Sequence, residues 1–173
     1  MSTSNLFKEI FEWIAVILIA VAVSFLINRF LIVNATVPTS SMETTIMASD
    51  RIIGNRLAYL RNEPERGDII IFKYPDNENI LYIKRLIGLP GEELQVSHGQ
   101  VFINGEPLDE PYLNVETQGE FGPYQIPEDG YFMMGDNRND SADSRYWNNT
   151  YLYRDGMIGK AMFRYWPSVK KLE

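Results

Sequence analysis

The hydrophobic positions of this chain divide it into two unequal parts. Residues 13–33 form a nearly unbroken apolar run, interrupted by Ser24 and by the pair Asn28 and Arg29. A helix of this length measures about 31 Å, which matches the hydrocarbon core of a bilayer. Arg29 lies near the end of the run, where its side chain can extend to the membrane surface. The pattern predicts a transmembrane helix, with residues 1–34 as N-terminal tail and anchor.

Two other structures are compatible with this apolar run. A cleaved secretory signal peptide has a shorter apolar segment behind a basic start, but here Lys8 is accompanied by Glu9 and Glu12. No pattern of small residues typical of a cleavage site follows before Thr36. The other alternative is a buried core helix. We favour an uncleaved single-pass anchor, whose orientation the charges do not decide because Lys8 and Arg29 flank it on opposite sides.

Beyond the anchor the helical periodicity largely stops, and short runs rich in β-branched and aromatic residues predict strands. The predicted strands are residues 68–74, 81–87, 94–96, 101–103, 131–134 and 157–165. Residues 97–100 are expected to form a four-residue hairpin loop. Residues 35–173 are therefore predicted to be a mostly β domain of short strands. Within it, the stretch of about 92–129, rich in Gly, Pro and acidic residues, is predicted to form a small β lobe.

Composition and charge exclude several classes of function. The chain has no cysteine, which removes disulfides, thiolate metal sites and cysteine nucleophiles. It has a single histidine, His98, so a multi-histidine metal site is excluded. His98 stands beside Gly99 at a predicted hairpin tip, where we expect a solvated turn residue. The net charge of -7 and the lack of a basic cluster argue against nucleic acid as a partner. The sequence implies no cofactor and no metal.

Without a usable histidine, a hydrolytic site would need a hydroxyl nucleophile and a different base. Residues 39–45 contain five hydroxyl side chains and follow the anchor within a few residues. An ordinary Ser/Thr loop would have the same composition. A serine becomes a good nucleophile only when a base removes its proton. The segment is therefore a candidate only together with such a base.

Lys84 is the candidate base. Lys84 and Arg85 are adjacent in a predicted strand, so they point to opposite faces and one of them must share a face with apolar neighbours. An arginine does not lose its proton in proteins, whereas a desolvated lysine can. Lowering a lysine pKa from about 10.4 to about 7 corresponds to roughly 4.6 kcal/mol, which full burial can supply. A surface strand lysine is the alternative.

A dense polar loop follows the predicted strand 131–134. Residues 135–145, GDNRNDSADSR, combine carboxylates, amides, two arginines and two serines. We expect a braced turn in which Arg145 pairs with Asp143 or with Asp136. A plain surface loop and a calcium site are the alternatives. The spacing does not fit an EF-hand loop, which needs glycine at its sixth position and glutamate at its twelfth.

Four segments together, in order along the chain, resemble the motifs of the bacterial type I signal peptidases, also called leader peptidases. They are PTSSM at 38–42, RGDIIIFKYP at 66–75, YIKRLIGLPG at 82–91 and GDNRNDSADSR at 135–145. The resemblance covers nearly the whole chain, and the single short anchor is similar to the Gram-positive forms. Two positions depart from the usual family pattern. Thr44 stands where proline is usual, and Asn139-Asp140 stands where Asp-Asn is usual.

The resemblance implies a membrane-bound serine endopeptidase that removes N-terminal signal peptides from exported preproteins. Ser41 would be the nucleophile and Lys84 the general base, a Ser–Lys variant of the catalytic triad. The Ser41 backbone N–H and the Thr39 hydroxyl would form the oxyanion hole. Three residues of the polar loop would support this dyad: Ser141 by orienting the Lys84 amine, and Asp143 with Arg145 by bracing the loop.

The same resemblance implies partners and a location. The substrates would be preproteins cut after small residues at the first and third positions before the bond. Membrane lipid and the secretion translocon are the other expected partners. The N-terminus would be cytoplasmic and residues 35–173 would lie outside the cytoplasm. Self-cleaving Ser–Lys repressors share the chemistry but carry a DNA-binding domain in place of an anchor. An inactive membrane-tethered paralogue, acting as a binding or scaffold protein, is the alternative from another class.

Overall fold

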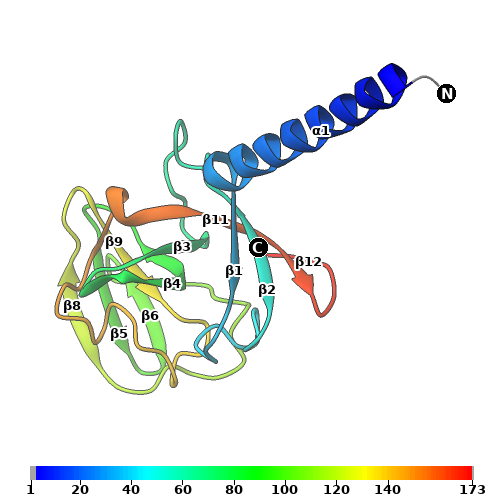
Figure 1. Cartoon of the computed structure of the whole chain (residues 1–173). Helices are drawn as coiled ribbons and strands as arrows, with labels where there is room; N and C mark the ends of the chain where they lie inside the picture. The colour runs from blue at the N-terminus through cyan, green and yellow to red at the C-terminus, as the bar shows by residue number, and fades with distance from the viewer. Residues whose placement is uncertain (1–2, 173) are drawn as a thin grey trace.

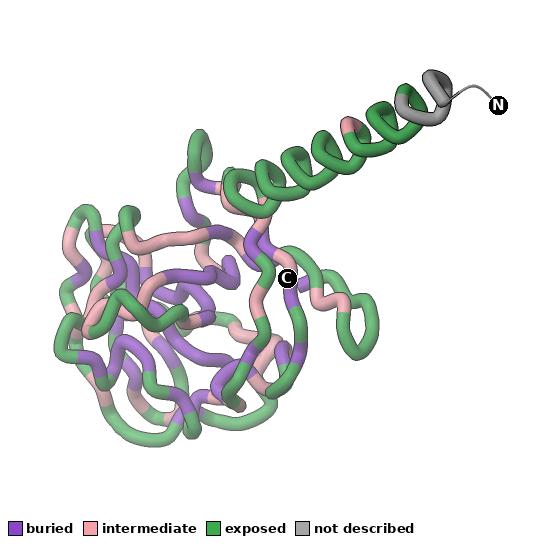
Figure 2. Tube along the Cα trace, viewed as in Figure 1, coloured by how far each residue is buried: buried purple, intermediate pink, exposed green. Residues whose placement is uncertain are grey.

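The computed structural model describes the backbone of residues 3–172 and the side chains of residues 8–172. A helix, α1 (Thr3–Leu26), projects from a β-rich body, as Figure 1 shows. It continues through one turn of π-helix, η1 (Ile27–Leu31). The stretch Lys8–Leu31 is long and apolar enough to cross a membrane. Nearly all of it is exposed, as the tube in Figure 2 shows. A mostly β fold behind one apolar N-terminal helix is what the sequence predicts.

The helix ends two residues earlier than the apolar run predicts. Ile32 and Val33 belong to strand β1 (Ile32–Thr36), which pairs antiparallel with β2 (Arg51–Asn55). Val33 is buried in the core of the β domain. β-branched residues favour strands, and here the ladder with β2 provides hydrogen-bond partners that a continued helix would forgo. The last residues of the run therefore join the β domain.

Two antiparallel sheets build this domain. The main sheet has the order β1-β2-β11-β3-β4-β9-β10, with β12 paired to β11, and the second sheet has the order β7-β6-β5-β8. The other strands of the main sheet are β3 (Ile69–Tyr74), β4 (Asn77–Gly88), β9 (Gly130–Met134), β10 (Leu152–Tyr153), β11 (Met157–Trp166) and β12 (Lys170–Lys171). The second sheet consists of β5 (Glu93–Ser97), β6 (Gln100–Ile103), β7 (Glu106–Pro107) and β8 (Phe121–Gln125). A short 3-10 turn, η2 (Arg154–Gly156), precedes β11.

All six predicted strands are present, although β4 is longer than predicted. The predicted hairpin loop between β5 and β6 is wrong in length. Ser97 pairs with Gln100, so the turn contains only His98 and Gly99, whose φ angles are 50° and 81°. Two consecutive residues with positive φ are typical of the two-residue turns that match the twist of a hairpin. His98 is exposed there, as expected for a turn residue.

Buried apolar residues tie the sheets to each other and to the loop after β1. Ile87 of β4 and Phe132 of β9 pack with Leu94 of β5, so one cluster joins the two sheets. In another cluster, Met42 and Ile46 of the loop pack against core residues of the main sheet, and both are fully buried. The loop that contains residues 39–45 is therefore held in place by core packing.

Candidate active site

The loop after β1 presents Ser41 from a tightly bonded backbone. The Val37 N–H donates to the Asp50 carbonyl at 2.9 Å, and the Ser49 N–H donates to the Val37 carbonyl at 2.7 Å, which closes the loop at its base. The Ile46 N–H donates to the Met42 carbonyl at 2.8 Å and forms a single helical turn. Ser41 comes directly before the buried Met42 and is itself only 5% exposed.

Lys84 lies on β4, opposite Ile70 of β3, in a part of the strand that is buried on both faces. Its side chain is 4% exposed. A hydrogen bond of 2.5 Å joins Lys84 Nζ to Ser41 Oγ, although 43 residues separate them in the sequence. The structure thus brings the candidate nucleophile and the candidate base into direct contact.

Burial changes the protonation of this lysine. Desolvation is the main cause that lowers the pKa of Lys84 from 10.5 to about 8. The carboxylates of Asp143 and Asp136 oppose the shift, and the Arg145 guanidinium adds to it. An appreciable fraction of Lys84 is therefore a neutral amine at mildly alkaline pH, which is the state in which it can accept a proton.

A groove with a volume of about 380 Å³ opens onto this pair. One wall is formed by residues 38–41 and the other by residues 80–84 of β4, with Asp140 and Ala142 completing the lining. Thr39 Oγ1 lies 3.3 Å from Ser41 Oγ, and either hydroxyl can be the donor. Thr39 is exposed to the groove side of the loop. A second hydroxyl group thus lies next to the candidate nucleophile.

The polar loop 135–145 packs against the segment that contains Ser41. The Asn137 N–H donates to the Ser41 carbonyl at 3.1 Å. A side chain at Gly135 would place its Cβ 2.3 Å from the Ser41 carbonyl oxygen and 2.3 Å from Ser141 Oγ. Only a glycine permits this close approach, so position 135 helps to set the distance between the two loops.

Asp143 and Arg145 form a buried ion pair inside this loop. Arg145 Nε and Nη2 each donate to the Asp143 carboxylate at 2.8 Å, and both side chains are fully buried. The Gly135 N–H also donates to Asp143, at 3.0 Å, and Arg145 Nη2 donates to the Arg138 carbonyl at 2.6 Å. These contacts link the beginning of the loop to its end.

Ser141 is buried beside Gly135, but its hydroxyl has no hydrogen-bond partner among the residues that the structure describes. No hydrogen bond joins it to Lys84 in this state of the site. Its expected role toward the Lys84 amine stays a prediction.

Sequence reasoning missed a second buried ion pair on the opposite face of β4. Arg85 donates to the Asp136 carboxylate at 2.9 and 2.7 Å, and its guanidinium stacks 3.9 Å from the Tyr112 ring centroid. Thr45 donates to the same carboxylate at 2.5 Å. Asp136 therefore pairs with Arg85 and not with Arg145. The sequence did contain a signal for this pair: β4 has apolar residues on both faces, which implies that Lys84 and Arg85 are both buried and that Arg85 needs an acidic partner.

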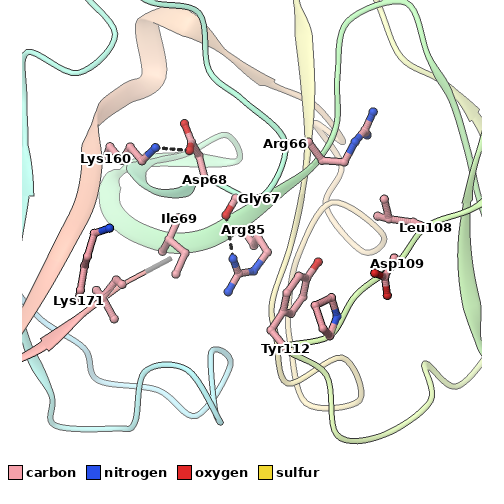
Figure 3. Close-up of a pocket in the computed structure, with 12 residues that line it drawn as sticks. Arg66, Gly67, Asp68, Ile69, Arg85, Leu108, Asp109, Tyr112, Lys160 and Lys171 are labelled. Atoms are coloured by element: carbon pink, nitrogen blue, oxygen red, sulfur yellow. Dashed lines mark hydrogen bonds and ion pairs between the residues drawn. The ribbon is translucent and has the colours of Figure 1, made fainter.

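A larger cavity, of about 830 Å³, lies on the Arg85 side of β4, and Figure 3 shows its lining. Lys160 forms an ion pair with Asp68, and Arg85 donates to the Gly67 carbonyl at 2.8 Å. No hydroxyl nucleophile stands beside a base among the residues that line it. Within residues 8–172, no group of three or more His, Asp or Glu side chains is placed to hold a metal ion. The groove at Ser41 is therefore the candidate active site.

Comparisons with known proteins match most of this chain to one family. The family model described as "Signal peptidase, peptidase S26" matches residues 10–166. A signal peptidase I from Leptolyngbya laminosa is 39% identical, and the alignment covers 92% of this chain and 81% of that protein. Signal peptidase I P from Bacillus subtilis subsp. natto is 37% identical, with 96% of each chain covered. The crystal structure of a signal peptidase I from Enterococcus faecalis has a TM-score of 0.51 and 34% identity, covering 57% of this chain and 97% of that one.

The pKa of Lys84 generates a prediction for the pH dependence of peptide cleavage. Because a proton must leave Lys84 before it can act as a base, kcat/KM should rise about tenfold per unit below pH 8 and level off above it. The measurement is cleavage of one peptide substrate by the full chain in detergent across pH 6 to 10, where roughly five points define the curve.

His98→Ala is the matched control, because it removes the one histidine of the chain at an exposed turn. It should leave the pH profile unchanged. A profile that is already level at pH 6, or one that His98→Ala displaces, would contradict the assignment of this titration to Lys84.

Proposed function

The chain belongs to the signal peptidase family, peptidase S26, and on that premise we propose that it removes N-terminal signal peptides from exported preproteins as a membrane-bound serine endopeptidase. The observation that supports this most is the 2.5 Å contact between Ser41 Oγ and a buried Lys84 whose pKa is lowered to about 8. The two groups face a groove large enough for a peptide segment.

In the proposed acylation step, neutral Lys84 takes the proton of Ser41 while Ser41 Oγ attacks the scissile carbonyl carbon. The resulting oxyanion is stabilised by the Ser41 backbone N–H and by the Thr39 hydroxyl, whose Oγ1 lies 3.3 Å from Ser41 Oγ. The Lys84 ammonium then gives its proton to the departing amine, and the signal peptide remains as an ester on Ser41. Water, activated by the neutral Lys84, hydrolyses that ester.

The residues of loop 135–145 are proposed to maintain the dyad. The hydroxyl of Ser141 is buried without a partner, so it is available to bind and orient the Lys84 amine during the reaction. The Asp143–Arg145 ion pair maintains the conformation of the loop. Its two charges act in opposite directions on the pKa of Lys84, which Asp143 raises and Arg145 lowers. These are positioning roles, since neither residue of the pair contacts Ser41.

The substrate is proposed to bind as an extended strand along β4. Residues 81–84 of β4 pair with β3 on one side, whereas β9 pairs with β4 only from Arg85 onward. The other edge of residues 81–84 has no strand partner among the described residues and lies at the groove, where it can form backbone hydrogen bonds to a peptide. Apolar lining by residues such as Ile80, Leu81 and Ala142 suits small side chains before the cleaved bond.

The location of this activity follows from its substrates. Signal peptides are removed after the preprotein crosses the membrane, so we propose that residues 35–173 lie outside the cytoplasm and the N-terminus inside. Lys8–Leu31 has the length and composition for the single span that this arrangement needs. Membrane lipid and the secretion translocon are the expected neighbours of the domain.

An inactive binding or scaffold protein has no support in the geometry of the site. Ser41 and Lys84, the proposed nucleophile and base, are in direct contact. Thr44, the departure from the usual proline, has its hydroxyl bonded to Asn114 Nδ2 at 3.1 Å, on the exposed side of the loop. The departure therefore leaves the Ser41–Lys84 pair intact.

Substitution of the dyad tests the mechanism directly. Ser41→Ala, Lys84→Ala and Lys84→Arg should each reduce preprotein cleavage by at least about 10³-fold. The first removes the nucleophile, the second removes the base, and the third replaces the base by a guanidinium that stays charged. Cleavage of a preprotein by the purified full chain in detergent measures this.

Lys73→Arg is the matched control for the lysine substitution, since Lys73 is a partly exposed strand residue paired with Glu78. It should retain normal turnover. Near-normal turnover by Lys84→Arg would instead identify a different base.

The oxyanion role of Thr39 has its own test. Thr39→Val keeps the shape of the side chain and removes the hydroxyl, so kcat should fall by about 10²–10³ with little change in KM. Thr39→Ser should keep most of the activity. Thr36→Val, at an exposed position of β1, is the control and should behave like the parent. If Thr39→Val matched the parent in steady-state kinetics, the oxyanion would have to be bound by other donors.

Topology can be tested in cells. Protease added to intact protoplasts should digest the chain after residue 33 and spare the N-terminus, because the β domain is expected outside. Immunoblots against tags at both ends measure the fragments, and a cytoplasmic marker shows that the protoplasts are sealed. Full protection of the β domain in sealed protoplasts would place the active site on the wrong side for this function.

A further inference from the structure

The groove contains one exposed carboxylate, Asp140, at a position where the chain departs from the usual family pattern. Asp140 is the sole Asp or Glu among the residues that line the groove. It is exposed, whereas Asp136 and Asp143 of the same loop are buried. A charge at this position faces whatever peptide occupies the groove.

Asp140 is held in a defined position next to the nucleophile. Ser40 Oγ donates to Asp140 Oδ2 at 2.6 Å, and the Asp140 N–H donates to the Asn137 carbonyl at 3.0 Å. Asn137 in turn donates from Nδ2 to the Ser40 carbonyl at 3.2 Å. Ser40, which donates the hydrogen bond to Asp140, directly precedes Ser41, and their Cα atoms are about 3.8 Å apart.

No cation among residues 8–172 forms an ion pair with the Asp140 carboxylate. Asp136 is neutralised by Arg85, and Asp143 is neutralised by Arg145. The Ser40 hydroxyl fixes the Asp140 carboxylate without supplying a charge. The cation nearest in the groove lining is Lys84, which the mechanism requires as a neutral amine.

We infer that Asp140 is a specificity-determining residue that favours lysine or arginine, and disfavours aspartate or glutamate, beside the scissile bond of the substrate. This rests on the proposed function. Both groups are exposed and the attraction is partly screened by water, so the expected effect is about three- to tenfold in kcat/KM for each charge. Backbone pairing with β4 and the apolar part of the groove would be the same for all these substrates.

The experiment compares preproteins that differ at one residue. Lysine, glutamine or glutamate is placed either at the second residue before the cleaved bond or at the first or second residue after it. The full chain in detergent is assayed, and the ratio of kcat/KM for lysine over glutamate is taken at each position. At one or more positions the parent should give a ratio of about ten or more, and Asp140→Asn should bring it close to one.

Asp140→Asn keeps an acceptor for Ser40 and removes only the charge. Asp129→Asn is the matched control, because it removes the same charge at an exposed turn that lines none of the cavities described above. It should keep the ratio of the parent. The parent alone supplies a second measurement, since its ratio should fall toward one when salt is raised from about 0.05 M to about 0.5 M.

Equal ratios in the parent and in Asp140→Asn at all three positions, or a ratio that salt does not change, would overturn the inference. A parent that cuts the glutamine preprotein without discriminating charge refutes this inference alone. A parent that cuts none of the preproteins refutes the proposed function itself, so the two failures are distinguishable.

Discussion

The burial of two adjacent cations in β4 is the constraint around which the site is built. Consecutive strand residues point to opposite faces, so Lys84 and Arg85 meet two different environments. An ion that leaves water needs a partner or must lose its charge. Arg85 cannot lose its proton and is matched by Asp136. Lys84 has the Ser41 hydroxyl as its hydrogen-bond partner, and its pKa falls to about 8. The displacement from 10.5 corresponds to a penalty on the charged form on the order of 3 kcal/mol.

Charged residues of loop 135–145 change the size of this penalty on the Lys84 ammonium. Asp136 and Asp143 raise the pKa of Lys84, and Arg145 lowers it, so the loop 135–145 carries charges of both signs near the amine. Removing one partner of a buried pair leaves the other charge unmatched, which typically costs about 3–5 kcal/mol. The two ion pairs therefore couple the shape of the loop to the protonation of Lys84, because neither pair can open without changing the field at the amine.

The local elements could be predicted from the sequence, but several long-range contacts could not. Alternating and continuous apolar runs located β3, β4, β5, β6, β9 and β11, and the run at 13–33 located the helix, whereas β1, β2 and β8 were not predicted. Its end at Leu31 was missed because Ile32 and Val33 are as apolar as the helix, and only pairing with β2 decides between the two structures. Composition suggested Ser41 and Lys84 as candidates, yet their roles came from resemblance. The contact between Arg85, Asp136 and Thr45 joins three distant segments, which no periodicity reports.

The dependence on long-range contacts has a consequence for how the site works. Ser41 and Lys84 are 43 residues apart, and the Ser40–Asp140 bond spans 100 residues. In an unfolded chain Lys84 would be hydrated and charged, and Ser41 would be an ordinary hydroxyl. The reactivity proposed for this pair requires that β4, the loop after β1 and the loop 135–145 are packed together, because that packing removes water from the amine. The cores that hold Met42, Leu86 and Met133 are thus part of the chemistry. A change that loosens them would rehydrate the amine and raise the pKa of Lys84 toward its ordinary value.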